Sequence, residues 1–139
     1  MTTTTEPGSV SPNTHLGIDP VLCGEPVRLE VGRAVARLET TAAMGADARG
    51  LVHGGFVFGL ADYAAMLAVN DPNVVLGAAE TRFLAPVRVG EEVEASAEVS
   101  AEKGRKRVVE VVACVGEREV MRGSFTCFVL DRHVLETGG

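Results

Sequence analysis

From residue 27 onward, hydrophobic and polar side chains alternate in runs that are separated by Gly, Pro or Asn. Alternation with a period of two predicts β-strands whose two faces have different surroundings. In the clearest run, 91–102, every second residue from Val93 to Ala101 is apolar, and the residues between are Glu or Ser. Further strands are predicted at 27–31, 33–39, 74–84, 107–115 and 119–130. Gly32, where the alternation changes phase, predicts a bulge or a tight turn.

One long segment does not alternate. Between Gly54 and Val69 only Asp62 and Tyr63 are polar, and Ala, Leu and Met are frequent. This length and composition favour a helix over a strand, and a helix that is apolar on nearly all sides is buried. The Asn and Pro residues at 70–73 end it. The order of elements therefore predicts an α+β fold, in which a mostly antiparallel sheet wraps around one long helix.

The composition agrees with this fold class. The chain has 139 residues, 46% hydrophobic and 23% charged, as expected of one globular domain. Residues 1–20 are rich in Thr, Ser, Pro and Gly and predict a flexible tail, followed by a single domain at 21–139. The net charge of −6 and the absence of Trp argue against a nucleic-acid partner. Without an 18-residue apolar run, no membrane span is expected.

Three cysteines without a CxxC pair predict neither a disulfide framework nor a metal site. The first 14 residues contain no Lys or Arg and no apolar core, so we do not expect them to form a signal peptide. Together these features predict a cytoplasmic protein.

Two stretches resemble a known family. The run GLVHGGFVFGLAD at 50–62 resembles the helix motif of the PaaI and 4-hydroxybenzoyl-CoA thioesterase branch of the hotdog-fold acyl-CoA thioesterases. The run TRFLAPVRVGEEVEASAEV at 81–99 resembles the strand-turn-strand segment that follows in that family. The resemblance implies a hotdog fold and hydrolysis of an acyl-CoA. It also implies a homodimer or a dimer of dimers with the active site at the subunit interface. No separate cofactor is implied, because coenzyme A is part of the substrate.

The residues of the helix suggest the chemistry. Free backbone N–H groups at Gly54 and Gly55, together with the helix dipole, offer a site for a developing oxyanion. Asp62 places a carboxylate in an apolar helix, which is costly unless the group is paired, solvated or neutralised. We expect the Gly55 amide, with Gly54 in reserve, to polarise the thioester carbonyl. Asp62 would then attack the carbonyl or activate a water molecule, and the sequence does not choose between these roles.

The spacing between Gly55 and Asp62 indicates how the chains assemble. Gly55 and Asp62 lie seven residues apart, which is about 10 Å along a helix. An oxyanion donor and its nucleophile or base must both lie about 3 Å from one reacting centre. One helix cannot supply both, whereas a second, antiparallel copy can bring its Asp62 opposite Gly55. The expected assembly is a two-fold dimer with two equivalent sites.

Other candidate residues are less specific. His53 contacts the thioester region or fixes the loop. Asp47 stands where the family commonly has Asn or Gln, and it orients water, binds a cation or is a loop residue. Basic residues near the entrance of the active site would hold the phosphates of coenzyme A. The candidates are Arg82, Arg88, Arg105 and Lys106. An apolar pocket for the acyl group could be lined by Phe56, Phe58, Tyr63, Met66 and Phe83, or these could be core.

Three alternatives stay open. The stretch 102–128 also resembles the ligand-binding hotdog domain of the fatty-acid biosynthesis repressor, which implies an acyl-CoA sensor that binds substances of the malonyl-CoA type without turnover. A dehydratase or hydratase would use His53 and Asp62 as a proton-transfer pair and yield an enoyl or 3-hydroxyacyl product. A purely structural dimer has no need for an acid in the helix.

Overall fold

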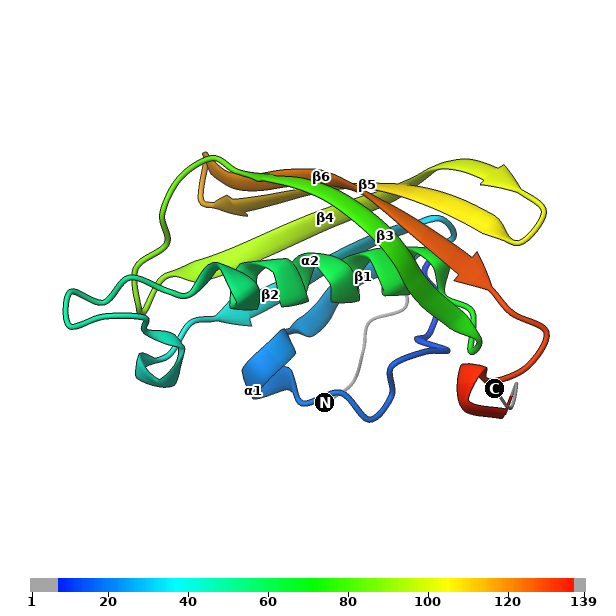
Figure 1. The fold of residues 1–139 in the computed structure, drawn as a ribbon, viewed down its shortest axis with the longest axis horizontal. Coiled ribbons are helices and arrows are strands. Elements are labelled where there is room, and N and C mark those ends of the chain that lie inside the picture. Colours follow the sequence, from blue (N-terminus) through cyan, green and yellow to red (C-terminus); the bar gives the residue numbers. More distant parts are fainter. Residues whose placement is uncertain (1–7, 137–139) are drawn as a thin grey trace.

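The computed structural model describes residues 8–136 of the chain. Six antiparallel strands form one sheet, and the long helix α2 (Gly54–Val69) lies along one face of it (Figure 1). The order across the sheet is β1-β2-β4-β5-β6-β3. The strands are β1 (Glu25–Glu30), β2 (Arg33–Glu39), β3 (Val74–Phe83), β4 (Glu92–Lys103), β5 (Lys106–Val115) and β6 (Arg118–Val129). The α+β fold that the sequence predicts, an antiparallel sheet with one central helix, is confirmed.

Each predicted element is present within two residues of its expected bounds. Gly32 forms the turn of the β1–β2 hairpin with φ 78°, a backbone conformation that glycine adopts without strain. The helix ends at Asn70, which has φ 54° and whose amide donates to the Met66 carbonyl. Three short helices were not predicted, namely α1 (Pro20–Cys23) and the 3-10 helices η1 (Ala42–Met44) and η2 (Val134–Glu136).

The α2 helix packs mainly on β4, β2 and β5. Many of the buried strand residues that face it there are alanines, namely Ala34, Ala36, Ala95, Ala97 and Ala113. Small side chains let the helix approach the sheet closely, so that Leu60, Ala64 and Leu67 of the helix are fully buried. Because the helix lies toward this side, β3 at the sheet edge is covered less, and its central residues 77–80 are exposed.

The first part of the expected tail, residues 1–7, lies outside the described residues. Residues 8–19 are held against the domain by hydrogen bonds. The Val10 amide donates to the Leu29 carbonyl at 3.0 Å, and the Asn13 amide donates to Asn70 Oδ1 at 2.7 Å. Thr14 is buried. This segment therefore lies along the domain, near the end of α2.

Candidate active site

Two loops, 40–53 and 84–91, hold the start of α2. Val52 N donates to Val87 O at 2.8 Å, which joins the loops to each other. His53 N donates to a carbonyl of the first loop at 2.9 Å. The last residue before the helix is therefore fixed through its backbone, and the first helical residues occupy a defined position.

The side chain of His53 caps the helix. Its Nδ1 accepts a hydrogen bond from the Gly55 N–H at 2.8 Å, and its carbonyl accepts one from the Phe56 N–H at 3.1 Å. A ring nitrogen that accepts a hydrogen bond carries no proton, so the proton of the neutral ring lies on Nε2. Among residues 8–136, the Gly54 amide has no hydrogen-bond acceptor.

The hydrogen bond between His53 and Gly55 affects which amide can act as the predicted oxyanion donor. We expected the Gly55 amide to act first, with Gly54 in reserve. In the structure the Gly55 N–H is already bound to His53, whereas the Gly54 N–H is free to bind a ligand. Gly55 could join it only if the imidazole turned away. The assignment of either amide stays a prediction, and the geometry favours Gly54.

Asp62 lies in the middle of α2 and is half-buried. Its Oδ1 atom is buried and has no hydrogen-bond partner among the described residues. Burial raises the pKa of this carboxyl from 3.8 to about 6, because a low-dielectric surrounding disfavours the charged form. A carboxyl with this pKa is ionised at neutral pH and is a stronger base than an exposed one, which suits it to accept a proton.

Two cysteines lie near Asp62. The buried Cys127 is on β6, and its thiol pKa is raised to about 12 by burial and, secondly, by the charge of Asp62. The pKa of Cys23, at the end of α1, is raised by burial and by the charges of Asp19 and Asp62. A thiol with a raised pKa stays protonated and is a poor nucleophile. In this cluster Asp62 is therefore the group that can act as a base or nucleophile.

Asp47 shapes the loop before the helix. Its Oδ1 accepts hydrogen bonds from Arg49 N at 2.9 Å and Leu51 N at 3.2 Å. This side chain is exposed in a loop that projects at the end of the molecule where α2 starts (Figure 1). These contacts account for Asp47 as a turn residue, and a catalytic role stays a prediction.

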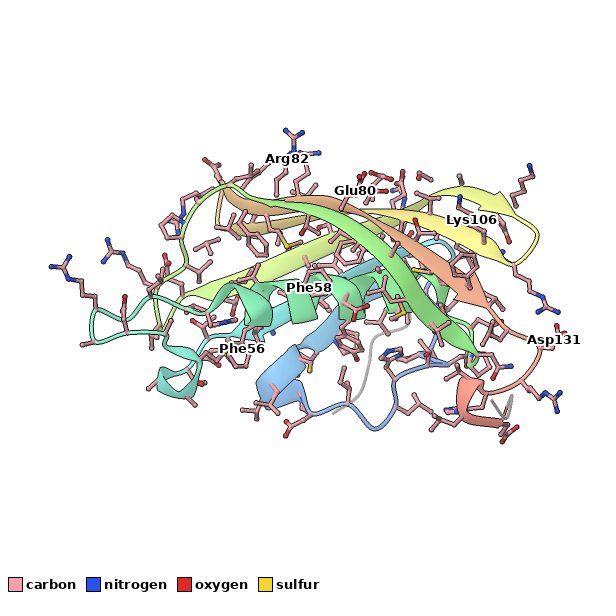
Figure 2. All side chains as sticks on the ribbon, viewed as in Figure 1. Phe56, Phe58, Glu80, Arg82, Lys106 and Asp131 are labelled. Carbon is pink, nitrogen blue, oxygen red and sulfur yellow. The ribbon has the colours of Figure 1, made fainter. Side chains whose placement is uncertain are left out.

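The four basic candidates do not come together within the chain. Arg82 and Arg88 lie at the end of β3 and in the loop after it, on the same side of the molecule as the start of α2. Lys106 lies on the β4–β5 hairpin at the opposite end (Figures 1 and 2), and the neighbouring Arg105 pairs with Asp131. One chain therefore cannot use all four residues on a single phosphate group.

An apolar groove of about 390 Å³ opens beside Gly54. All of its lining residues are apolar, and they include Leu51, Val57, Phe83 and Leu84. The Phe83 ring lies over Gly54, since a Cβ atom at this glycine would be 3.3 Å from the ring. Of the residues that we considered for an acyl pocket, only Phe83 lines this groove.

The other acyl-pocket candidates lie elsewhere. Tyr63 and Met66 are buried in the core. Phe58 packs on Phe125 of β6, with ring centroids 5.5 Å apart, and the ring of Phe56 lies edge-on to His53. In Figure 2 the labelled Phe56 and Phe58 point to different sides of α2. They do not form one pocket.

Sequence reasoning missed Leu51, Leu84 and the two cysteines near Asp62. Leu51 and Leu84 belong to different loops, and no local pattern signals that these loops meet. Cys127 is 65 residues from Asp62 in the sequence.

Two further features are absent from residues 8–136. No three His, Cys, Asp or Glu side chains come together there as metal ligands would. None of the helices there has the length and the apolar character that a membrane span needs.

Comparison with known proteins assigns the family. The model of the thioesterase superfamily matches residues 49–121, which contain the HGG sequence, all of α2 and the edge strand β3. The chain therefore belongs to the thioesterase superfamily. Its structural neighbours include PaaI-like hotdog thioesterases. A mutant of the phenylacetic acid degradation protein PaaI from Thermus thermophilus is 30% identical, with a TM-score of 0.72 over 78% of this chain and 95% of that one.

A solved structure with higher sequence identity belongs to a protein whose name states no function. The uncharacterized protein PH1136 from Pyrococcus horikoshii is 50% identical, with a TM-score of 0.91 over 91% of this chain and 98% of that one. The fold is thus shared along nearly the whole length of both chains.

Curated relatives are longer than this chain. Methylthioribose-1-phosphate isomerase from Aquifex aeolicus is 52% identical over 119 residues, which are 85% of this chain and 26% of that protein. Transcription factor FapR from Caldanaerobacter subterraneus is 33% identical over 124 residues, which are 88% of this chain and 61% of FapR. The chain thus spans less than two thirds of the length of either relative.

Proposed function

We propose that the protein is an acyl-CoA thioesterase whose active site is completed by a second copy of the chain. The observation that carries this proposal is the pair of groups on α2. The backbone N–H of Gly54 at the helix start has no acceptor among the described residues and can bind an anionic oxygen. Asp62 has a buried carboxylate oxygen without a partner among the described residues, which is costly unless a ligand or a partner uses it.

The distance between these groups requires the second copy. Eight residues separate Gly54 from Asp62, and at 1.5 Å per residue they lie about 12 Å apart along the helix axis. Both groups must approach one carbonyl within about 3 Å. A two-fold axis that sets the helices antiparallel brings the Gly54 of one chain toward Asp62 of the partner subunit, and it creates two such sites.

The proposed reaction is hydrolysis of the thioester to a free acid and a thiol. The Gly54 N–H binds the carbonyl oxygen and stabilises the negative charge that develops on it. Asp62 of the partner subunit, ionised, either attacks the carbonyl carbon or takes a proton from the water that attacks. The C–S bond breaks and the sulfur leaves as the thiol after protonation. In the nucleophilic route, water then hydrolyses the acyl-enzyme anhydride.

The groove beside Gly54 favours an apolar acyl group. It begins at the proposed oxyanion donor, and every side chain that lines it, including Leu51, Phe83 and Leu84, is apolar. A carboxylated acyl group would lose its hydration there without gaining a charged or polar side chain as a partner. We therefore expect aliphatic or aryl acyl-CoA esters to be preferred over malonyl-CoA.

A release assay for free thiol tests this proposal. Acetyl, malonyl, hexanoyl, phenylacetyl and benzoyl esters of coenzyme A are incubated with the wild type and with Asp62→Asn. The proposal expects turnover of at least one apolar ester and its loss in the variant. Absence of thiol release across the panel would contradict the proposal. Formation of an enoyl or 3-hydroxyacyl product would indicate a hydratase instead.

A second candidate is a binding module that holds an acyl-CoA without turnover. It is favoured by the 33% identity to the transcription factor FapR over 88% of this chain. Calorimetric titration of the same esters separates the two functions. A binding module would give saturable binding with no thiol release, and Asp62→Asn would leave the affinity nearly unchanged.

A further inference from the structure

One wall of the apolar groove comes from the loop 84–91, which lies beside the start of α2 (Figure 1). Four consecutive residues of this loop line the groove, namely Leu84, Ala85, Pro86 and Val87. Backbone hydrogen bonds hold both ends of this stretch. Leu84 N donates to Val120 O at 2.8 Å, and Val87 O accepts from Val52 N at 2.8 Å. The residue between these anchors that needs another contact is Pro86.

Arg118 holds the middle of the wall. Pro86 has no backbone N–H, so its carbonyl is the one backbone group through which a hydrogen bond can fix it. Arg118, the first residue of β6, donates from Nη2 to Pro86 O at 3.2 Å. Within residues 8–136 no other donor is bound to this carbonyl. Loss of the guanidinium therefore releases this part of the wall.

Glu91 fixes the guanidinium in turn. Both of its carboxylate oxygens accept from Arg118 Nη2, at 3.0 and 3.2 Å, and Oε1 also accepts from Arg88 N at 2.7 Å. The Arg88 amide and, after it, Arg118 lower the pKa of the Glu91 carboxyl, so this group is ionised at neutral pH. An exposed ion pair contributes little by itself. Here the pair also holds a backbone carbonyl of the loop, which gives it a positional effect.

The second half of the loop is held without Arg118. Thr40 is 3% exposed, and its Oγ1 accepts from Gly90 N at 3.0 Å and donates to Glu91 O at 2.6 Å. Removal of Arg118 should therefore change the first half of the loop, which lines the groove, and leave the second half in place.

We propose that Arg118 is a positioning residue that sets the preference for long over short acyl groups, because it holds the Pro86 carbonyl and with it the wall of the groove. This inference rests on the proposed function, in which the groove receives the acyl group. Arg118 does not contact the reacting atoms, since the proposed donor and carboxylate lie at Gly54 and Asp62.

The effect should grow with the length of the acyl group. Acetyl carries a single methyl group beyond the carbonyl, whereas hexanoyl carries four further CH₂ groups. Each buried CH₂ improves binding about fourfold. A wall that can move away loses its close contacts with these groups. A hexanoyl ester is therefore penalised and an acetyl ester is not.

The first test is the ratio of kcat/KM for hexanoyl-CoA to that for acetyl-CoA. It is measured for the wild type, for Arg118→Met and for the control Arg122→Met, because Arg122 lies on the same strand and pairs with Glu119 but does not line the groove. In Arg118→Met the ratio should fall at least about tenfold, mainly through a higher KM for hexanoyl-CoA. In Arg122→Met it should stay within about twofold of the wild type.

This ratio separates positioning from folding. Partial unfolding lowers the rates with both esters equally and leaves their ratio unchanged. An unchanged ratio in Arg118→Met, or an equal fall in Arg118→Met and Arg122→Met, overturns the inference.

Glu91 provides an independent check. Glu91→Gln removes the charge that holds Arg118, and its amide oxygen can still accept from Arg88 N. The ratio should fall at least about threefold. The double variant with Arg118→Met should be no worse than Arg118→Met alone, because both changes act through the Pro86 carbonyl. Losses that multiply in the double variant contradict this route.

Binding without turnover separates this inference from the proposed function. S-hexyl- and S-ethyl-coenzyme A are thioethers that cannot be hydrolysed, and calorimetry gives their affinities for the same variants. If the wild type releases no thiol but Arg118→Met lowers the affinity ratio at least about tenfold, the inference stands and the thioesterase fails. If thiol is released but neither ratio changes in Arg118→Met, the thioesterase stands and the role of Arg118 is wrong. A wild type that binds both thioethers equally also overturns the inference.

Discussion

The imidazole Nδ1 of His53 accepts a hydrogen bond from the amide of Gly55, two residues on, at 2.8 Å. Histidine is an unusual N-cap, since Ser, Thr, Asp and Asn are preferred. The bond leaves Gly54, and not Gly55, as the glycine whose amide is free at the helix start. His53 thus stabilises α2 and also determines which N–H a substrate meets first.

The cap predicts a stability difference between two variants. His53→Ala removes the acceptor for Gly55 and should lower the free energy of unfolding by about 1 kcal/mol, whereas His53→Asn retains a capping acceptor and should lose less than about 0.5 kcal/mol. Urea unfolding of both variants measures this difference. Equal stability of the two variants would show that the cap contributes nothing.

Removal of one N–H tests the oxyanion donor. Gly54 is the first residue of α2, a position where proline is tolerated because its missing N–H has no acceptor in the helix. Gly54→Pro should lower kcat about 10²–10³-fold, as loss of an oxyanion donor does. Gly54→Ala is the matched control, because it keeps the N–H and places the same Cβ near Phe83. Steady-state kinetics that show equal losses in both variants would assign the effect to crowding.

The raised pKa of Asp62 predicts the pH dependence of hydrolysis. Burial makes the ionised form less favourable, so the carboxylate forms only as the pH rises through about 6. The value of kcat/KM should therefore fall about tenfold per pH unit below this pKa and level off above it. A rate profile between pH 4.5 and 8.5 provides the measurement. A midpoint near 4 would mean that the active carboxyl is exposed or is a different residue.

Asp62 should also cost stability. The native state keeps a proton on Asp62 between pH 3.8 and about 6 that the unfolded chain has released. The free energy of unfolding therefore falls as the pH rises through this range. Asp62→Asn carries no charge and should be more stable than the wild type at pH 8, by about 1 kcal/mol. Thermal unfolding at pH 8 and pH 4 should show this advantage shrinking at the lower pH, and an Asp62→Asn variant that is less stable at pH 8 would contradict it.

The elements were predictable because their patterns are local. Alternation identifies β4 through Val93, Ala95 and Ala97, and the sixteen apolar-rich residues from Gly54 identify α2. The short helix α1 had a signal as well, since Asp19 caps it and Pro20 is its first residue. The Thr-, Ser-, Pro- and Gly-rich composition of residues 1–20 hides this signal, because such a composition is typical of a tail.

The surroundings of the site were less predictable. Asp62 could be singled out as a polar residue in an apolar helix, but its burial beside Cys23 and Cys127 depends on packing between distant segments. The groove at Leu51 and Leu84 depends on the meeting of two loops. These arrangements follow from tertiary contacts and leave no trace in the spacing of nearby residues.

The sharing of one site by two chains is tested most directly by combining two inactive variants. Gly54→Pro and Asp62→Asn are co-expressed with different affinity tags, and dimers that contain one chain of each are purified. If Gly54 acts with Asp62 of the partner subunit, one of the two sites in the mixed dimer is intact. Thiol release should then recover to about half of the wild-type rate per dimer, since two-fold symmetry gives two equivalent sites. If the mixed dimer is as inactive as its parents, both groups act within one chain or neither acts, and the two-chain site is wrong.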